Sequence, residues 1–323
     1  MAKKMWLTLV VLLLSVLPAE TALGATITLN PTCSFAKAVA WINTGTAQSG
    51  CTKSGTIGIN DTIIVGLNHQ EFTIDSTVEI KKSMTIQCWQ FYGTLKTTNP
   101  STPIAIKIAA KNIVVQFSAI VLRGVANNTT TGIHVDGTAD TPNAPFDPKV
   151  IFNSGRITGF RRSGMYIYQG NVDMYNTQVD DNSNLSSFTQ GGGRGGAVRI
   201  ESQTKFGRLN IDSCWFIGNT AKRGGAIYNH GNLNVRNGMF YDNVATYSGN
   251  GTGAVVYAEY FPTNYYTAFG GGGYFENNQA DAGGYSIVAG ALAEFAGTTP
   301  FEAVGNSLPL CENPTGFAGC PTQ

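Results

Sequence analysis

Asp180 and Asp181 form the only pair of adjacent carboxylates in this chain of 323 residues. Two carboxyl groups held close together can supply the acid and the base or nucleophile of glycoside hydrolysis. The pair also precedes Asn182 in the way that Asp242 precedes Asn243, which indicates a repeated turn. We expect the turn, and we keep both aspartates as candidate catalytic residues.

His230 is a further catalytic candidate, because an imidazole titrates near neutral pH and can act as a general base. Its Asn-His-Gly context is more typical of a solvated corner, which we expect here. The three histidines (His69, His134 and His230) are scattered and no CxxC pair is present, so we predict no metal site. The glycines of 191–196 follow no strand-to-helix unit, so we predict no nucleotide cofactor.

An arginine stands two residues before the glycine that opens a coil at three places: Arg162, Arg194 and Arg223. If these segments stack in register, the guanidinium groups form a column with a spacing of about 5 Å. Such a column could bind the carboxylates or sulfates of an acidic glycan. The alternative is neutralisation by acids on adjacent turns: Asp180, Asp181 and Asp242.

The composition limits the fold that must position these residues. Only 13% of the residues are charged, against roughly 25% in ordinary domains, and 39 are glycine. This excludes a coiled coil, a disordered charged tail and an ordinary helical enzyme. Short strands joined by tight turns suit such a chain.

One pattern recurs: apolar-x-apolar, four residues, a large apolar residue, two residues, then often Asn. The copies begin at Met84, Ile113, Val150, Val172, Leu209 and Leu233, and the first of them places Phe91 at the large apolar position. A glycine marker precedes several copies, with its second glycine at 196, 225, 253 and 284, at intervals of 29, 28 and 31 residues.

These repeats predict an all-β parallel β-helix of about eight to ten coils. Each apolar-x-apolar unit is a strand with one face inward, and it can bury that face only against its neighbours. The recurring Asn should accept a left-handed backbone and stack its amides along the axis. The glycine marker should form corners where a Cβ would clash. No repeat has the period of a helical solenoid.

The segment FIGNTAKRGGAIYNHGNLNVRNGMFYDN (216–243) resembles the FxxN and GGA[ILV] repeats of polymorphic outer-membrane proteins, over about residues 165–290. The segment 33–39 resembles the CSLREA motif that opens many secreted bacterial β-helix proteins. Cys51 and the phrase at 58–64 follow in the order seen in those proteins.

This resemblance implies the pectate lyase-like, right-handed parallel β-helix superfamily and an adhesin-like or structural role. The arginine column makes an extracellular or cell-surface polysaccharide the candidate partner. Because the superfamily includes pectate lyases and polygalacturonases, the alternative is a polysaccharide lyase or glycoside hydrolase. Its site residues would be Arg161 and Arg162, or Asp180 and Asp181. We expect the non-catalytic function.

We expect a single domain over 25–323, with an N-terminal cap (25–60), coils (61–305) and a C-terminal cap (306–323). Ser34 fits the N-cap of a short helix over 33–43 that covers the first coil. Six cysteines in an exported chain favour disulfides. The candidate pairs, close in sequence, are Cys33 with Cys51 and Cys311 with Cys320, and this leaves Cys88 and Cys214 as candidates for buried thiols.

Residues 1–24 have the pattern of a signal peptide. Lys3 and Lys4 precede an apolar core over 6–17, and Ala22-Leu23-Gly24 fits a cleavage site before Ala25. The chain is therefore expected to be secreted or displayed at the cell surface, with no membrane span after cleavage. The mature part has 19 basic and 19 acidic residues, so we expect no attraction to nucleic acid.

Overall fold

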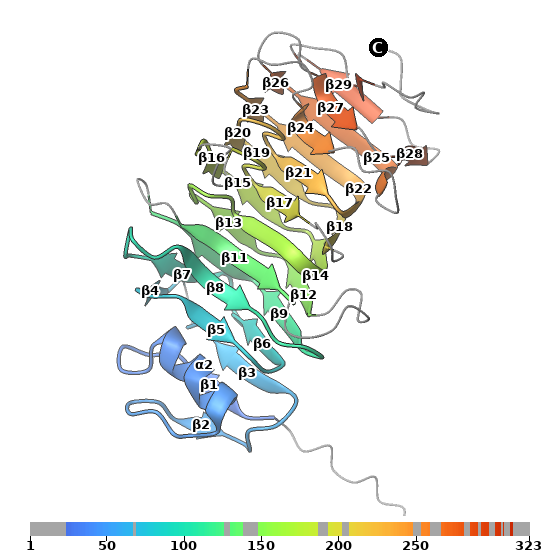
Figure 1. Ribbon diagram of the computed structural model, residues 1–323. Coiled ribbons are helices and arrows are strands. Elements are labelled where there is room, and N and C mark those ends of the chain that lie inside the picture. The colour runs from blue at the N-terminus through green and yellow to red at the C-terminus, as the bar shows by residue number, and fades with distance from the viewer. Residues whose placement is uncertain are drawn as a thin grey trace, which may run out of the picture.

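The computed structural model describes residues 24–66, 69–125, 130–137, 148–186, 193–201, 207–247, 253–258, 266–280, 285–289, 292–296, 301–304, 306 and 311–312. The expected signal peptide, apart from Gly24, and the expected partner of Cys311, Cys320, lie outside these residues. The predicted all-β class is confirmed. Strands of successive repeats stack in rows along the molecule, from the N-terminal end to the C-terminal end (Figure 1).

Most strands pair in parallel with the equivalent strand of the next repeat, and these pairings form four ladders. The first ladder consists of β3 (Asp61–Ile64), β6 (Met84–Gln87), β9 (Val114–Ser118), β12 (Lys149–Asn153), the end of β14 (Met165–Tyr175), β18 (Gly207–Asp212), the starts of β22 (Asn232–Tyr241) and β25 (Tyr266–Glu276), and β28 (Leu292–Ala296). The second ladder consists of β4 (Glu71–Ile74), β7 (Gly93–Thr97), β10 (Ile120–Arg123), β13 (Arg156–Thr158), β15 (Gln178–Asp180), β19 (Trp215–Ile217), the ends of β22 and β25, and β29 (Phe301–Val304).

The third ladder consists of β5 (Val78–Ile80), β8 (Ile104–Ile108), β11 (Thr131–Asp136), the start of β14, β17 (Val198–Glu201), β21 (Ile227–His230), β24 (Gly253–Ala258), β27 (Tyr285–Ala289) and β30 (Cys311–Glu312). The fourth ladder consists of β16 (Ser183–Asn184), β20 (Thr220–Ala221), β23 (Val244–Ala245) and β26 (Gln279–Ala280). At the N-terminal end, β1 (Thr26–Thr28) pairs in parallel with β3 and antiparallel with β2 (Lys53–Ser54).

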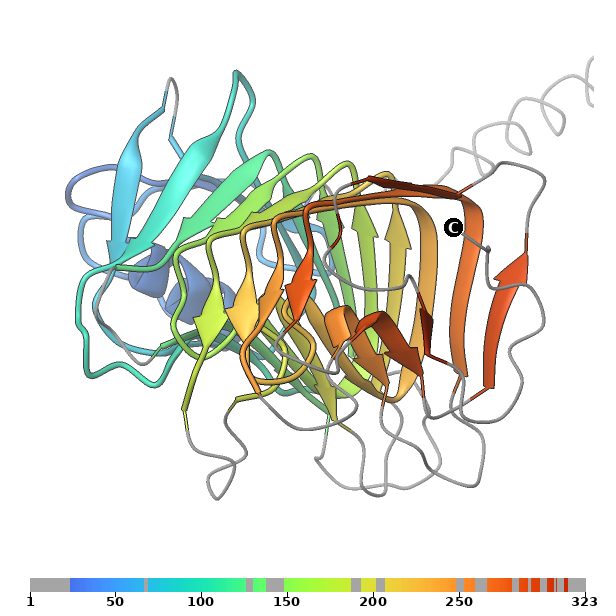
Figure 2. The ribbon, with the colours of Figure 1, turned by 90° about the horizontal axis from the view of Figure 1, so that it is seen from above.

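The predicted capping helix is present as α2 (Phe35–Thr44), which lies at the N-terminal end of the stack in both views (Figure 2). The Ser34 side chain accepts a hydrogen bond from the backbone N–H of Lys37, as an N-cap does. Its neighbour Cys33 is bonded to Cys51, which confirms that pair. No helix in the described part of the chain is long and apolar enough to cross a bilayer.

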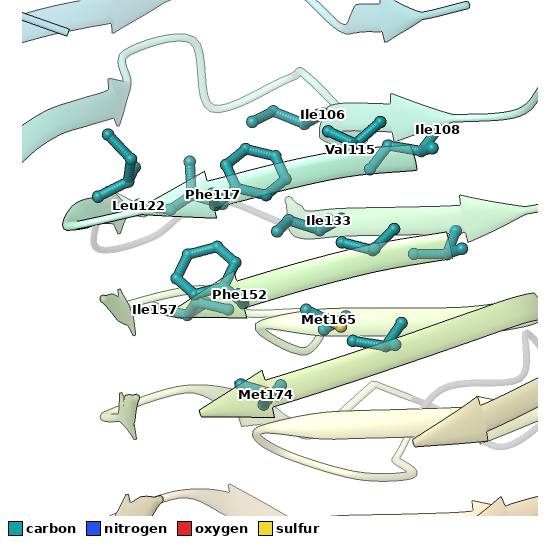
Figure 3. Close-up of a cluster of buried hydrophobic side chains, with 14 of the residues drawn as sticks. Ile106, Ile108, Val115, Phe117, Leu122, Ile133, Phe152, Ile157, Met165 and Met174 are labelled. Carbon is teal, nitrogen blue, oxygen red and sulfur yellow. The ribbon is translucent and has the colours of Figure 1, made fainter. Parts of the chain in front are cut away.

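The inward positions of the repeat form the core, as the alternation predicted. Figure 3 shows such side chains lying between the strands. In one column the rings of Phe216 and Phe240 stack at 5.1 Å, and those of Phe240 and Phe275 at 5.2 Å. Cys88 and Cys214 are buried free thiols, and burial raises the pKa of Cys214 to about 12.

The expected inward position of Phe91 is wrong, because this side chain is 67% exposed. The corner between β6 and β7 is longer than the equivalent corners between β9 and β10 and between β12 and β13, and Leu95 takes the core position instead. Leu95 pairs with Leu122, which pairs with Ile157. The extra corner residues displace Phe91 to the surface, where its backbone has a φ of 101°.

An amide ladder, buried except at its half-buried last member, marks the corner between the second and fourth ladders. It consists of Asn182, Asn219, Asn243, Asn278 and Asn306, and in each step a side-chain Nδ2 donates to the next Oδ1 at 2.9–3.1 Å. The stacked amides confirm that prediction. The left-handed backbone, however, belongs to the residue before each of the first four ladder amides: Asp181, Gly218, Asp242 and Asn277.

The glycine marker forms a second corner, as predicted. The backbone N–H of Gly196 donates to Gly225 O at 3.0 Å, and that of Gly225 donates to Gly253 O at 3.1 Å. A Cβ on Gly196 would lie 2.3 Å from Gly225 O, and one on Gly225 would lie 2.3 Å from Ala254 O. Side chains are therefore excluded by direct contact between successive repeats.

Candidate functional site

The side chain of Asp180 is held within the second ladder by hydrogen bonds. Arg156 Nε donates to its Oδ1 at 2.7 Å, and the same guanidinium also donates to Oδ2. Thr158 Oγ1 donates to Oδ2 at 3.1 Å, and Asp180 is only 2% exposed. Both oxygens are occupied, so this carboxylate holds the ladder together and does not face a substrate.

Asp181 lies at the left-handed corner that follows and is exposed to solvent. Its pKa is raised, first by desolvation and then by the charge and hydrogen bonding of Asp180, while Arg156 and Arg161 oppose the shift. The two adjacent aspartates therefore differ in environment. The turn that we expected is present, with Asp242 at the equivalent left-handed position.

Asp181 and Arg161 line one hollow of about 380 Å³, which we call the corner hollow. Arg123 also lines it, one repeat earlier, and donates to Glu71. Arg161 Nη1 donates to Ser183 Oγ at 3.2 Å. Part of the lining comes from residues without side chains, namely the glycines at 124, 159 and 218. The corner hollow thus combines two cations with one carboxylate.

His230 and Arg162 lie apart from that hollow and do not line it. His230 is buried at the end of β21, where it pairs with Glu201 in the third ladder, so the expected solvated corner is wrong. Arg162 forms an isolated bridge with Asn184, and its backbone N–H donates to Thr130 O. The structure brings together Asp181 and Arg161 among the five catalytic candidates, with Asp180 buried beside them.

The arginine column exists for two of its three members. Arg194 and Arg223 pair as a parallel bridge, whereas Arg162 pairs elsewhere. Arg194 Nη1 donates to Glu201 Oε1 at 2.7 Å and its guanidinium lies 5.0 Å from the centre of the Tyr228 ring. The partner of Arg194 is thus Glu201 and not one of the aspartates considered in the sequence.

Aromatic rings pack on the arginines beside the third ladder, and we call this layer of arginines and rings the wall. The guanidinium of Arg223 lies 5.0 Å from the Tyr247 ring and 5.1 Å from the Tyr257 ring. Arg199 lies 4.6 Å from the Tyr166 ring, whose hydroxyl donates to Glu201 at 2.9 Å. Arg194 and Arg223 are thus packed on aromatic rings. Glycan binding by the column of Arg162, Arg194 and Arg223 stays a prediction.

Charge pairing within the wall sets the pKa of Glu201. Burial acts to raise this pKa, but hydrogen bonds and charge from Arg199, together with hydrogen bonds from Tyr166 and Arg194, hold it below its usual value. No motif in the sequence points directly to Glu201 as a partner of the arginines. Aligning the repeats on the glycine marker places Glu201 and His230 at equivalent positions, since both follow the second glycine by five residues, but it does not indicate that Arg194 is the partner of Glu201.

A second hollow opens on the outer face of the first ladder, and we call it the sheet hollow. Its volume is about 460 Å³, and its polar lining residues include Tyr175, Asn210, Asp212, Asn234 and Arg236. Asn234 Nδ2 donates to Asn210 Oδ1 at 2.8 Å, so the amides are fixed in a row. Sequence reasoning missed this site because it followed the inward positions of the strands and not the outward ones.

A scan of the chain against protein-family models finds no match, and a search of curated proteins finds no matching relative. Any statement about family therefore rests on the motifs in the sequence.

Proposed function

We propose that this chain is a secreted or cell-surface right-handed parallel β-helix, of adhesin-like or structural type, that binds an extracellular polysaccharide without cleaving it. The parallel pairing of successive repeats in four ladders supports the β-helix. The disulfide Cys33–Cys51 is compatible with an oxidising compartment, and the pattern of residues 1–24 supports export. The FxxN and GGA[ILV] repeats and the CSLREA-like segment support an adhesin-like protein.

The sheet hollow is the observation that carries the binding proposal. It lies where two outward columns change from long polar side chains to small residues: Asn234 pairs with Ala268, and Arg236 pairs with Gly270. The space above Ala268 and Gly270 is therefore not filled by their own side chains. A concave site with a few fixed polar groups is typical of small-ligand and saccharide binding.

The lining of the sheet hollow suits a sugar chemically. Tyr175 is 39% exposed, so its ring can stack on the apolar face of a pyranose. The carboxylate of Asp212 accepts hydrogen bonds from sugar hydroxyls, and the guanidinium of Arg236 donates to hydroxyls or to a uronate carboxylate. Arg236 therefore extends the proposal to acidic polysaccharides.

The arrangement of the carboxylates favours binding over hydrolysis. A glycoside hydrolase of the usual kind needs two carboxyl groups that both face the substrate. Both oxygens of Asp180 are occupied by Arg156 and Thr158, and Asp181 is the one carboxylate in the described lining of the corner hollow. A polysaccharide lyase or glycoside hydrolase remains the alternative that the experiment below tests.

A glycan array probed with the exported protein tests the binding proposal. We expect binding to one or more polysaccharides, and a loss of about tenfold in affinity for Tyr175→Ala, because an aromatic contact to a sugar is removed. Tyr92→Ala is the matched control, since Tyr92 is 44% exposed and does not line the sheet hollow. Equal binding by wild type and Tyr175→Ala would overturn the site.

Incubation with pectate, alginate and glycosaminoglycans tests the absence of catalysis. We expect no unsaturated ends and no new reducing sugars. Turnover of any of these polymers would contradict the non-catalytic function and favour the lyase or hydrolase.

A further inference from the structure

Asp61 is a fully buried carboxylate at the start of the first ladder. Its Oδ1 accepts a hydrogen bond from the backbone N–H of Ala25 at 2.8 Å. The backbone N–H of Gly58 donates to Oδ1 at 2.9 Å and to Oδ2 at 3.2 Å. Two backbone donors converging on one side chain suit an ionised carboxylate, which only accepts hydrogen bonds.

No side-chain cation in the described residues forms an ion pair with Asp61. A buried charge without a counter-charge is costly, and proteins ordinarily pair such groups. Asp61 belongs to the Gly-Ile-Asn-Asp-Thr-Ile phrase at 58–63, to which the function above assigns no role. Within the described part of the uncleaved chain, the hydrogen-bond donors to this carboxylate are therefore backbone N–H groups, and no side-chain cation pairs with it.

Cleavage at the expected point would create a positive charge next to Asp61. Signal peptidase would hydrolyse the bond between Gly24 C and Ala25 N. Water supplies the hydroxyl of the new Gly24 carboxyl group and one hydrogen of the Ala25 amine, and a further proton from solvent makes that amine an ammonium. The nitrogen that becomes charged is the one already 2.8 Å from Asp61 Oδ1.

Neighbouring backbone fixes the position of both Ala25 and Gly24, the two residues that this bond joins. Ala25 is fully buried, and its carbonyl accepts from the backbone N–H of Thr62 at 2.7 Å. The next residue, Thr26, pairs with Thr62 in the parallel ladder. A Cβ on Gly24 would lie 2.2 Å from Asn60 O, so a glycine is required before the cleavage point when the uncleaved chain adopts this arrangement.

We propose that cleavage after Gly24 creates an α-ammonium group at Ala25 that pairs with the buried carboxylate of Asp61 and fixes the N-terminal edge of the first ladder. The inference rests on the export and cleavage in the proposed function, but not on glycan binding. It makes the mature N-terminus a structural group. No side-chain cation of the described residues pairs with this carboxylate before cleavage, so the N-terminal end gains this ion pair only in the exported chain.

The test begins with the full precursor, expressed with its own leader, and the exported product. Intact mass and N-terminal sequencing should give a chain that starts at Ala25. The α-amine is then acetylated with an N-hydroxysuccinimide ester, and the rate is followed by mass spectrometry of the N-terminal peptide. The α-amine of the folded wild type should react about tenfold or more slowly than in urea, because the pair shields it. The exposed Lys82 amine is the internal reference.

Asp61→Asn keeps an acceptor but removes the charge, and we expect its α-amine to react about tenfold faster than that of the wild type. Asp75→Asn is the matched control, since Asp75 is exposed, and it should react like the wild type. A product that starts at another residue would overturn the cleavage site itself. A product that starts at Ala25, with an α-amine that reacts equally fast folded and unfolded, would overturn the ion pair alone, whether or not Asp61→Asn folds.

Discussion

The side-chain Nδ2 of Asn219 donates to Oδ1 of Asn243 at 3.0 Å, and this single contact ties one repeat to the next inside a buried corner. The same Nδ2 also donates to Val179 O at 2.8 Å. Oδ1 of Asn219 in turn accepts from the backbone and side-chain N–H groups of Asn182. Every polar atom of this amide is therefore satisfied by a neighbouring repeat.

Asn219→Ala should lower the free energy of unfolding by about 3 kcal/mol, because it leaves buried donors and acceptors without partners. Urea unfolding measures the change. Asn234→Ala is the control, since Asn234 is a half-buried amide on the outer face of the first ladder, and it should cost about 1 kcal/mol or less. Equal losses in the two variants would contradict the role of the amide ladder.

Gly225→Ala should destabilise the stack by about 3 kcal/mol or prevent folding, because the new Cβ would lie 2.3 Å from Ala254 O. Gly58→Ala is the comparison, since the nearest atom to its Cβ would be 3.8 Å away. Thermal unfolding followed by circular dichroism distinguishes the two. A Gly225→Ala protein as stable as Gly58→Ala would show that the repeats do not approach each other at this corner.

The lowered pKa of His134 should make the free energy of unfolding depend on pH. Burial lowers its pKa from 6.5 to about 4; Asp136 opposes the shift, and Lys107 and Arg199 add to it. The unfolded chain takes up the proton below about pH 6.5, but the folded chain does so only near pH 4. This contribution is therefore complete above pH 6.5 and is lost as the pH falls towards 4, by about 2 kcal/mol between pH 7 and 5.

Urea unfolding at pH 7 and pH 5 checks this prediction. His134→Phe keeps the ring that stacks on Tyr166 at 4.7 Å but cannot titrate, so its loss of stability between the two pH values should be smaller than that of the wild type. His69→Phe should keep the full wild-type loss, because His69 is exposed. If His134→Phe and the wild type lose the same stability, His134 does not titrate as described.

Arg156→Gln should destabilise the protein by about 2 kcal/mol, because it removes the cation from the buried Asp180 carboxylate. The expected loss of stability is moderate because the Arg156 side chain is 43% exposed and partly screened by solvent. The same variant should leave glycan binding unchanged, since Arg156 does not line the sheet hollow. Loss of binding without loss of stability would instead place Arg156 in the ligand site.

The inward face of the fold was predictable from the sequence because burial repeats with a fixed period. Leu209 and Ile211 face the core, and their alternation is visible in the sequence. The corner glycines were predictable for the same reason, since Gly196 and Gly225 recur at the same place in each repeat. Phe91 was misplaced because an insertion in one corner shifts the local register, and a short pattern match does not detect it.

The outward face was much less predictable, because its columns are defined only by pairing between repeats of unequal length. Asn210 lies beside Asp173 in space but 37 residues away in sequence. Likewise, the partner of Arg194 is Glu201, reached through the bend into β17, and no charge pattern indicates it. The sheet hollow depends on such columns, so it emerged only from the structure.

The most direct test of the account is a crystal structure of the exported protein with an oligosaccharide of a polymer that binds in the array. The account predicts an intact sugar in the sheet hollow, with one ring stacked on Tyr175 and a hydroxyl or carboxylate bonded to Arg236. A sugar bound at the corner hollow or another surface, or a cleaved product in any site, would contradict it.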